Sequence, residues 1–308
     1  MLPVTYASEW RTVSIVQVAF FAVILITFLT GMFLRIFRVD ATLRKNLFIV
    51  TFFFTMFSSF KIGGGICAII QVDQDKPSTG LMIATYILDT ASLGFLLKSI
   101  VNYLDYMMFP RPSSSSNGGI LGIFNKGGNS DFQEVRIGLS NRKDSESSTE
   151  DMRPTDPKKD LSKFHPFRVT TVVIMVAIIL SIVGACEMSD GSSGGSTGTY
   201  FKVSSLLFLA ALILVFGLLV YIYFQQPTFR SGIRIIMFSL VFYLVRIIYS
   251  IVSSFTGINI SSTSFNKFTL IFGDYKYYTF MGFLMESLIA IMLFIISQWF
   301  LTRNPTHF

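Results

Sequence analysis

Long apolar stretches alternate with short polar connections along most of the chain. Seven of them reach the roughly 20 residues that a helix needs to cross a bilayer. We place these spans at residues 13–34, 47–71, 80–108, 167–187, 201–224, 233–256 and 278–301. All nine prolines fall outside them, which fits because proline interrupts a helix interior. The pattern predicts an all-α integral membrane bundle of seven transmembrane helices.

The distribution of Lys and Arg predicts the orientation of this bundle. With the N-terminus outside, and with the ends of each span counted with the adjoining segment, 17 of the 25 basic residues fall on the inner side, five on the outer side and three inside the spans. Basic residues concentrate on the cytoplasmic side of membrane proteins. We therefore expect the N-terminus outside and the C-terminus in the cytoplasm, in the plasma membrane or another membrane of the secretory pathway.

One long polar segment, 109–166, separates helices 1–3 (1–108) from helices 4–7 (167–308) of this single bundle. Its low hydrophobicity and mixed charge predict a disordered cytoplasmic loop. Ser147 and Ser148 each precede an acidic residue by three positions, so they are candidate sites for an acid-directed cytoplasmic kinase. The other interpretation of the loop is a passive linker.

The net charge of +7 does not indicate a nucleic-acid partner, because the basic residues lie mainly between apolar spans. Membrane lipid is the partner that the composition implies, since 52% of the residues are hydrophobic and only 14% are charged.

Four charged residues lie near the middle of the apolar spans, namely Lys61, Asp89, Arg246 and Glu286. With a rise of about 1.5 Å per residue, each lies roughly 12–15 Å from the outer end of its span, near the bilayer centre. A charge at that depth is costly unless it faces protein and is paired. We therefore predict that Arg246 pairs with Glu286, with Lys61 and Asp89 within reach.

Small and polar residues at three- and four-residue spacing accompany these charges and predict inward faces. Tyr243, Tyr249 and Ser250 surround Arg246, and Gly282 lies one turn before Glu286. A neutral layer of four charges has two interpretations. It lines a cavity for an unknown ligand or ion, as intramembrane ionisable residues commonly do, or it only fixes helix packing.

Several classes are excluded by missing residues. The seventh span has no lysine for a retinal Schiff base, and the two histidines lie outside all spans, which argues against a metal site. No phosphate-binding glycine motif and no pair of catalytic aspartates is present. We expect no catalytic residues, no enzymatic activity and no cofactor. The Asp-Arg-Tyr and Asn-Pro-x-x-Tyr motifs of rhodopsin-like receptors are also missing.

The segments Leu-x-Arg-x-x-Tyr-Ser at 244–250 and Met-Glu at 285–286 resemble a fungal seven-helix family known only as a domain of unknown function. The resemblance implies a fungal membrane protein without known activity. A second fungal family, the lipid-translocating exporters, shares the topology, but its Arg-x-x-x-Arg-x-x-Glu segment is not found here.

Three functions follow from these observations. The leading hypothesis is a receptor-like or sensor protein with an intramembrane polar site. The alternatives are a transporter or lipid translocator that uses Asp89 and Glu286, and a structural membrane protein.

Two further features lie on the predicted outer side. Cys67 and Cys186, the only cysteines, fall at similar depth, so a disulfide is a candidate if the second and fourth helices are neighbours. The sequon at Asn259 is a candidate glycosylation site, although it lies close to the end of the sixth span.

Overall fold

Seven apolar helices long enough to cross a membrane are present in the computed structural model, which describes residues 7–36, 41–74, 78–108, 166–189, 196–225, 230–256 and 272–302. The first six spans are the helices α1 (Ala7–Ile36), α2 (Ala41–Asp73), α3 (Thr79–Met108), α4 (Pro166–Ser189), α5 (Ser196–Gln225) and α6 (Arg230–Thr256). The seventh is composed of α7 (Tyr275–Tyr277), a π-helix η6 (Tyr278–Leu284) and α8 (Met285–Thr302). No strand occurs among the described residues, so the all-α prediction is confirmed.

The observed helices differ from the predicted spans mainly at their ends and in the seventh span. α1 begins at Ala7, six residues before the predicted span, and this extension adds Trp10 to the bundle. α4 begins at Pro166, a favourable first position because proline needs no hydrogen bond from its nitrogen there. The seventh span was predicted as one helix, and the apolar pattern did not indicate its π-helical segment.

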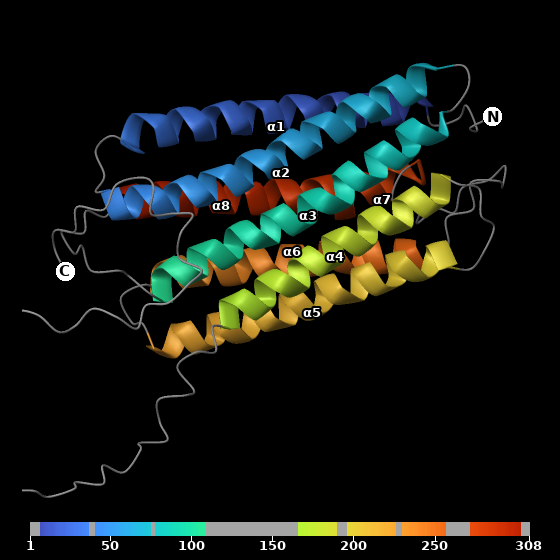
Figure 1. The fold of residues 1–308 in the computed structure, drawn as a ribbon. Helices are drawn as coiled ribbons and strands as arrows, with labels where there is room; N and C mark the ends of the chain where they lie inside the picture. The colour runs from blue at the N-terminus through green and yellow to red at the C-terminus, as the bar shows by residue number, and fades with distance from the viewer. Residues whose placement is uncertain are drawn as a thin grey trace, which may run out of the picture. The chain divides into compact units, whose positions relative to one another are not determined.

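Each helix packs against the next one in the chain, and α8 closes the ring by packing against both α1 and α6 (Figure 1). α3 is the most enclosed helix, with 67% of its spanning window buried, and it also contacts α5. Because successive helices run in opposite directions, the start of one helix lies at the same end of the bundle as the end of the next. Trp10 of α1, Asp73 of α2 and Tyr275 of α7 therefore mark one end of the bundle, which we call the Trp10 end.

Small residues allow the closest approaches. A Cβ atom on Gly65 of α2 would lie 2.6 Å from Cγ2 of Val18 on α1, and one on Gly94 of α3 would overlap Ile178 of α4. Close packing of this kind drives helix association in lipid, where no hydrophobic effect separates one apolar helix from another. These glycines therefore fix how α1, α2, α3 and α4 approach one another.

Candidate functional site

The four intramembrane charges form a closed network of ion pairs, which we call the charged quartet (Lys61, Asp89, Arg246 and Glu286). Lys61 Nζ contacts Oδ1 of Asp89 and lies 2.5 Å from Oε2 of Glu286. Arg246 places Nη2 at 2.6 Å from Oδ2 of Asp89 and Nε at 2.6 Å from Oε1 of Glu286. Each cation thus bridges both carboxylates, and the Arg246–Glu286 pair has the predicted partners.

Burial of the quartet is nearly complete, since no member is more than 5% exposed. Removing such charges from water is costly, and mutual attraction offsets that cost only when the geometry is good and the remaining donors find partners. Here all four carboxylate oxygens are engaged and the total charge is zero. The quartet therefore specifies how α2, α3, α6 and α8 face each other.

Arg246 is held more tightly than Lys61. Its Nη1 donates to Oγ of Ser250 at 2.6 Å, one turn further along α6. Its guanidinium carbon lies 5.8 Å from the ring centre of Tyr249. Ser250 and Tyr249 were predicted as supporting residues, and both contact the guanidinium.

The other two supporting residues act at neighbouring positions. Tyr243 is fully buried one turn along α6, and its hydroxyl donates to the backbone oxygen of Leu93 on α3 at 2.9 Å. Gly282 lies against the ring of Tyr278, where an added Cβ would come within 3.2 Å of the ring. Gly282 therefore supports the seventh span rather than the quartet itself.

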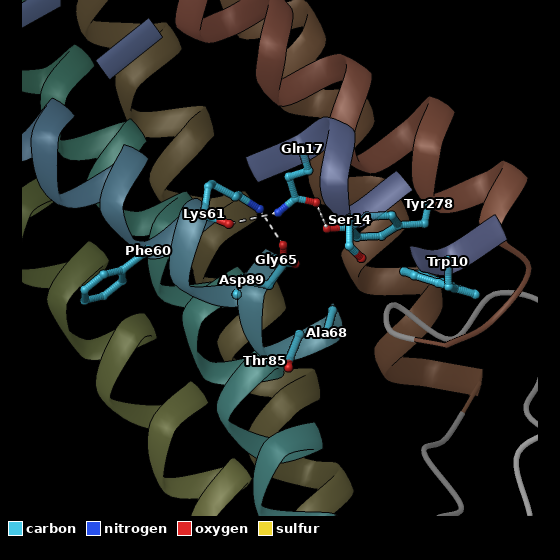
Figure 2. A pocket seen from close by; sticks show the side chains of 11 residues that line it. Trp10, Ser14, Gln17, Phe60, Lys61, Gly65, Ala68, Thr85, Asp89 and Tyr278 are labelled. Atoms are coloured by element: carbon cyan, nitrogen blue, oxygen red, sulfur yellow. Dashed lines mark hydrogen bonds and ion pairs between the residues drawn. The ribbon is translucent and has the colours of Figure 1, made fainter. Parts of the chain in front are cut away.

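A narrow pocket leads to one corner of the quartet (Figure 2). Its empty volume, including its open side, is about 330 Å³, and its enclosed part has space for about one water molecule. Lys61 and Asp89 line the pocket, whereas Arg246 and Glu286 do not.

Polar and aromatic side chains from α1 and the seventh span form the wall nearest to the Trp10 end (Figure 2). Gln17 connects the two sides, because its Nε2 donates to the backbone oxygen of Lys61 at 3.1 Å and its Oε1 accepts from the Tyr278 hydroxyl at 2.9 Å. The rings of Trp10 and Tyr278 lie 5.0 Å apart between centroids. The aromatic rings and the amide therefore lie on the side of the ion pair that faces the Trp10 end.

The chain before α7 is tied to the start of α1. Trp10 Nε1 donates to the backbone oxygen of Gly273 at 3.0 Å, and the Trp10 ring packs on Phe272 with centroids 5.5 Å apart. Phe272 has a φ of 62°, which is uncommon for a residue with a bulky side chain. This strained residue persists because Trp10 and its surroundings hold it in place.

Beyond the quartet, away from the pocket, the core is mainly apolar, with single buried hydroxyls between large side chains. One turn along each quartet helix lies a large side chain that is at most 2% exposed, namely Phe57, Leu93, Tyr243 and Ile289. Phe21 of α1 packs edge-on against Phe57, with centroids 5.4 Å apart. The pocket therefore ends at the quartet and does not continue through the bundle.

The pocket lining includes residues that our prediction missed. Trp10, Ser14 and Gln17 follow four- and three-residue steps along α1 and are all at most 4% exposed. Two polar residues at helical spacing in an otherwise apolar span were a usable signal for Ser14 and Gln17. Trp10 could not be found in this way, because the predicted first span began after it.

Other predicted sites have different outcomes. Cys67 and Cys186 are both free thiols, so the candidate disulfide is not formed in the structure. The physical reason is that α3 packs against both α2 and α4 and lies between them. The long loop 109–166 with Ser147 and Ser148, and the sequon at Asn259, lie outside the described residues. Among the residues that are described, no cluster of His, Cys, Asp and Glu could hold a metal ion.

Seven spanning helices around a buried ionic network define an integral, multi-pass membrane protein. The chain belongs to the family described as Domain of unknown function (DUF7702), whose model matches residues 135–303. The matched part includes Arg246 and Glu286, while Lys61 and Asp89 precede it. No curated protein matches the chain, and no solved structure does.

Proposed function

We propose that the protein is a receptor-like sensor whose ligand enters at the Trp10 end and acts on the charged quartet. The observation that supports this most is the one-sided pocket, which reaches Lys61 and Asp89 and ends at an apolar layer. A ligand there alters the ion pairs that hold α2, α3, α6 and α8 together. Binding in this one pocket would therefore change the contacts among all four helices.

Energetics support a switch of this kind. Buried ion pairs are balanced between a large desolvation cost and a large attraction. A group that competes for one partner therefore changes the relative free energies of two helix arrangements, and it shifts their populations by its difference in affinity for them. The predicted orientation places the Trp10 end outside, which suits detection of an external solute.

The test is the accessibility of introduced cysteines in the Cys67→Ser and Cys186→Ser background. We expect Ser14→Cys to react with Ag⁺, a thiol reagent of about the size of a water molecule that crosses lipid poorly, added in chloride-free buffer to the Trp10 end of protein in liposomes. The modification should also change hydrogen–deuterium exchange in α6 and α8. Ser239→Cys is the matched control, because Ser239 is fully buried two turns beyond Arg246 and should not react. Reaction of neither cysteine, or of both, would overturn the proposal.

A transporter is the second candidate, and two buried hydroxyls support it. Within the described residues, Oγ of Ser58 and Oγ of Ser99 are buried without a hydrogen-bond partner. They lie on the far side of the quartet, where such groups could hold water or a passing ion. Proton flux through liposomes containing the protein, abolished by Glu286→Gln, would support transport over sensing.

The remaining predictions concern surroundings and origin. We infer that the chain lies in the plasma membrane or another secretory-pathway membrane, that its long loop is a substrate for a cytoplasmic kinase, and that it is of fungal origin. Each is supported by sequence pattern alone. The absence of enzymatic activity likewise stays a prediction.

A further inference from the structure

The two cations of the quartet differ in how they are held, and this difference indicates what the pocket recognises. Arg246 makes three hydrogen bonds, to Glu286, Asp89 and Ser250, and does not line the pocket. Lys61 contacts only the two carboxylates through Nζ, and it does line the pocket. Lysine also carries its charge at the end of a flexible four-carbon chain. Lys61 is therefore the corner of the quartet that a solute can replace.

The pocket wall favours a cation over an anion. The faces of aromatic rings carry negative electrostatic potential and attract cations, and Trp10 and Tyr278 supply two such rings. Past these rings the solute reaches the ion pair of Lys61 and Asp89, in which the carboxylate is the group that attracts a cation. The amide of Gln17 has both of its polar atoms engaged, so it does not present a free donor to an anion.

The size of the pocket restricts the cation further. Space for about one water molecule admits an ammonium group but not a bulky quaternary one. An ammonium group also has the N–H donors that Asp89 and Glu286 now receive from Lys61.

We propose that the pocket binds an ammonium group, either the free ion or the head of a small primary amine, which takes the place of Lys61 Nζ between Asp89 and Glu286. This proposal rests on the sensor function proposed above and specifies its ligand. The displaced Lys61 side chain turns toward the open side of the pocket, where solvent hydrates its charge. Lys61 thus acts as a tethered competitor that occupies the site until the ligand arrives.

The chain contains its own reporter for this event. Trp10 lines the pocket, and Trp299 is the only other tryptophan. In a Trp299→Phe background, the emission of Trp10 therefore reports on the pocket alone. The experiment titrates the full-length protein in phosphatidylcholine nanodiscs with methylammonium chloride. Tetramethylammonium chloride, which has the charge but no N–H donor, and sodium acetate serve as matched salts.

We expect a saturable change in emission with methylammonium and none with the other two salts. Lys61→Met removes the tethered competitor, so it should bind methylammonium at least about tenfold more tightly. If Lys61→Met folds only when methylammonium is present, that dependence also supports the proposal. Asp89→Asn should abolish binding, whereas Asp105→Asn, an exposed position on the same helix, should not.

Three outcomes would overturn the proposal. They are an equal response to tetramethylammonium, no response to methylammonium, and binding to a folded Lys61→Met protein that is no tighter than to the parent. A response to acetate alone would refute the ammonium class while the pocket remains a site, whereas an unreactive Ser14→Cys refutes the sensor function itself. Repeating the titration with phosphatidylethanolamine in the nanodiscs separates two sources, since a lipid ammonium head would weaken the response to the free amine.

Discussion

The quartet helices and the helical hairpin formed by α4 and α5 must both pack together in lipid, but different kinds of contact hold them. Around the quartet, four helices are joined by charged side chains that have few alternative partners in lipid. Between α4 and α5, and from α4 to α3, no ion pair joins the described residues, and the closest contacts involve small residues and single hydroxyls. Examples are Gly94 against Ile178 and Ser204 donating to the backbone oxygen of Ala177 at 2.7 Å. Charges specify which helices meet, whereas small residues set how closely they meet.

The largest expected effect is the loss of one quartet partner. Glu286→Gln or Arg246→Gln leaves the opposite charges buried and unbalanced, and each should destabilise the fold by roughly 3–5 kcal/mol. The double substitution should recover part of this loss, because it restores neutrality. Thermal denaturation in detergent, followed by size-exclusion chromatography, measures both effects.

The control is the exposed pair of Arg11 and Asp73, whose side chains lie 3.5 Å apart and are 56% and 46% exposed. Arg11→Gln should cost only about 0–1 kcal/mol, as is usual for surface pairs. Strictly additive losses at Arg246 and Glu286 would contradict their coupling.

The next effect concerns close packing near the hairpin. Gly94→Ala places a methyl group on the side chain of Ile178, and overpacking of this kind costs about 1–3 kcal/mol. Ile178→Ala should relieve part of that loss in the double variant. Gly217→Ala on α5 is the matched control, since its Cβ would meet no atom within 4 Å and no loss is expected. Equal thermal stability of the Gly94 and Gly217 variants would refute close packing as the determinant.

A smaller effect is expected at the pocket wall. Tyr278→Phe removes the donor to Gln17 and should cost roughly 1.5 kcal/mol, near the upper end for hydrogen bonds between membrane helices. Tyr221→Phe, on the lipid-exposed face of α5, should change the midpoint of denaturation little. Equal denaturation midpoints for Tyr278→Phe and Tyr221→Phe would contradict this prediction.

The smallest effect should appear within the hairpin. Ser204→Ala removes one hydrogen bond to Ala177, whose backbone oxygen keeps its place in the helix, so a loss of about 0.6 kcal/mol is expected. The same denaturation assay can resolve it against the parent protein. If Ser204→Ala lost as much stability as Glu286→Gln, the quartet and the hairpin would not differ in how strongly their polar contacts stabilise the fold.

The sequence predicted the parts of this structure that depend on hydrophobic length and on the cost of buried charge. The seven spans follow from the apolar runs. The quartet follows from four charges at one depth, because a charge in lipid is costly unless it faces protein and is paired. Trp10 and the π-helix were missed for different reasons. Trp10 lies before the predicted first span, and a run of apolar residues indicates the length of a span but not the spacing of its backbone hydrogen bonds.

The π-helix also affects how the chain is compared with its relatives. Each hydrogen bond in such a segment spans one residue more than in an α-helix, so η6 accommodates extra chain length without breaking the helix. Deleting one residue there, for instance the exposed Phe280, would return the segment to α-helical spacing while Tyr278 and Glu286 keep their faces. A one-residue deletion in the α-helical part of the span would instead rotate the residues on its two sides by about 100° relative to each other. A single-residue gap in an alignment of the family therefore belongs between 278 and 284.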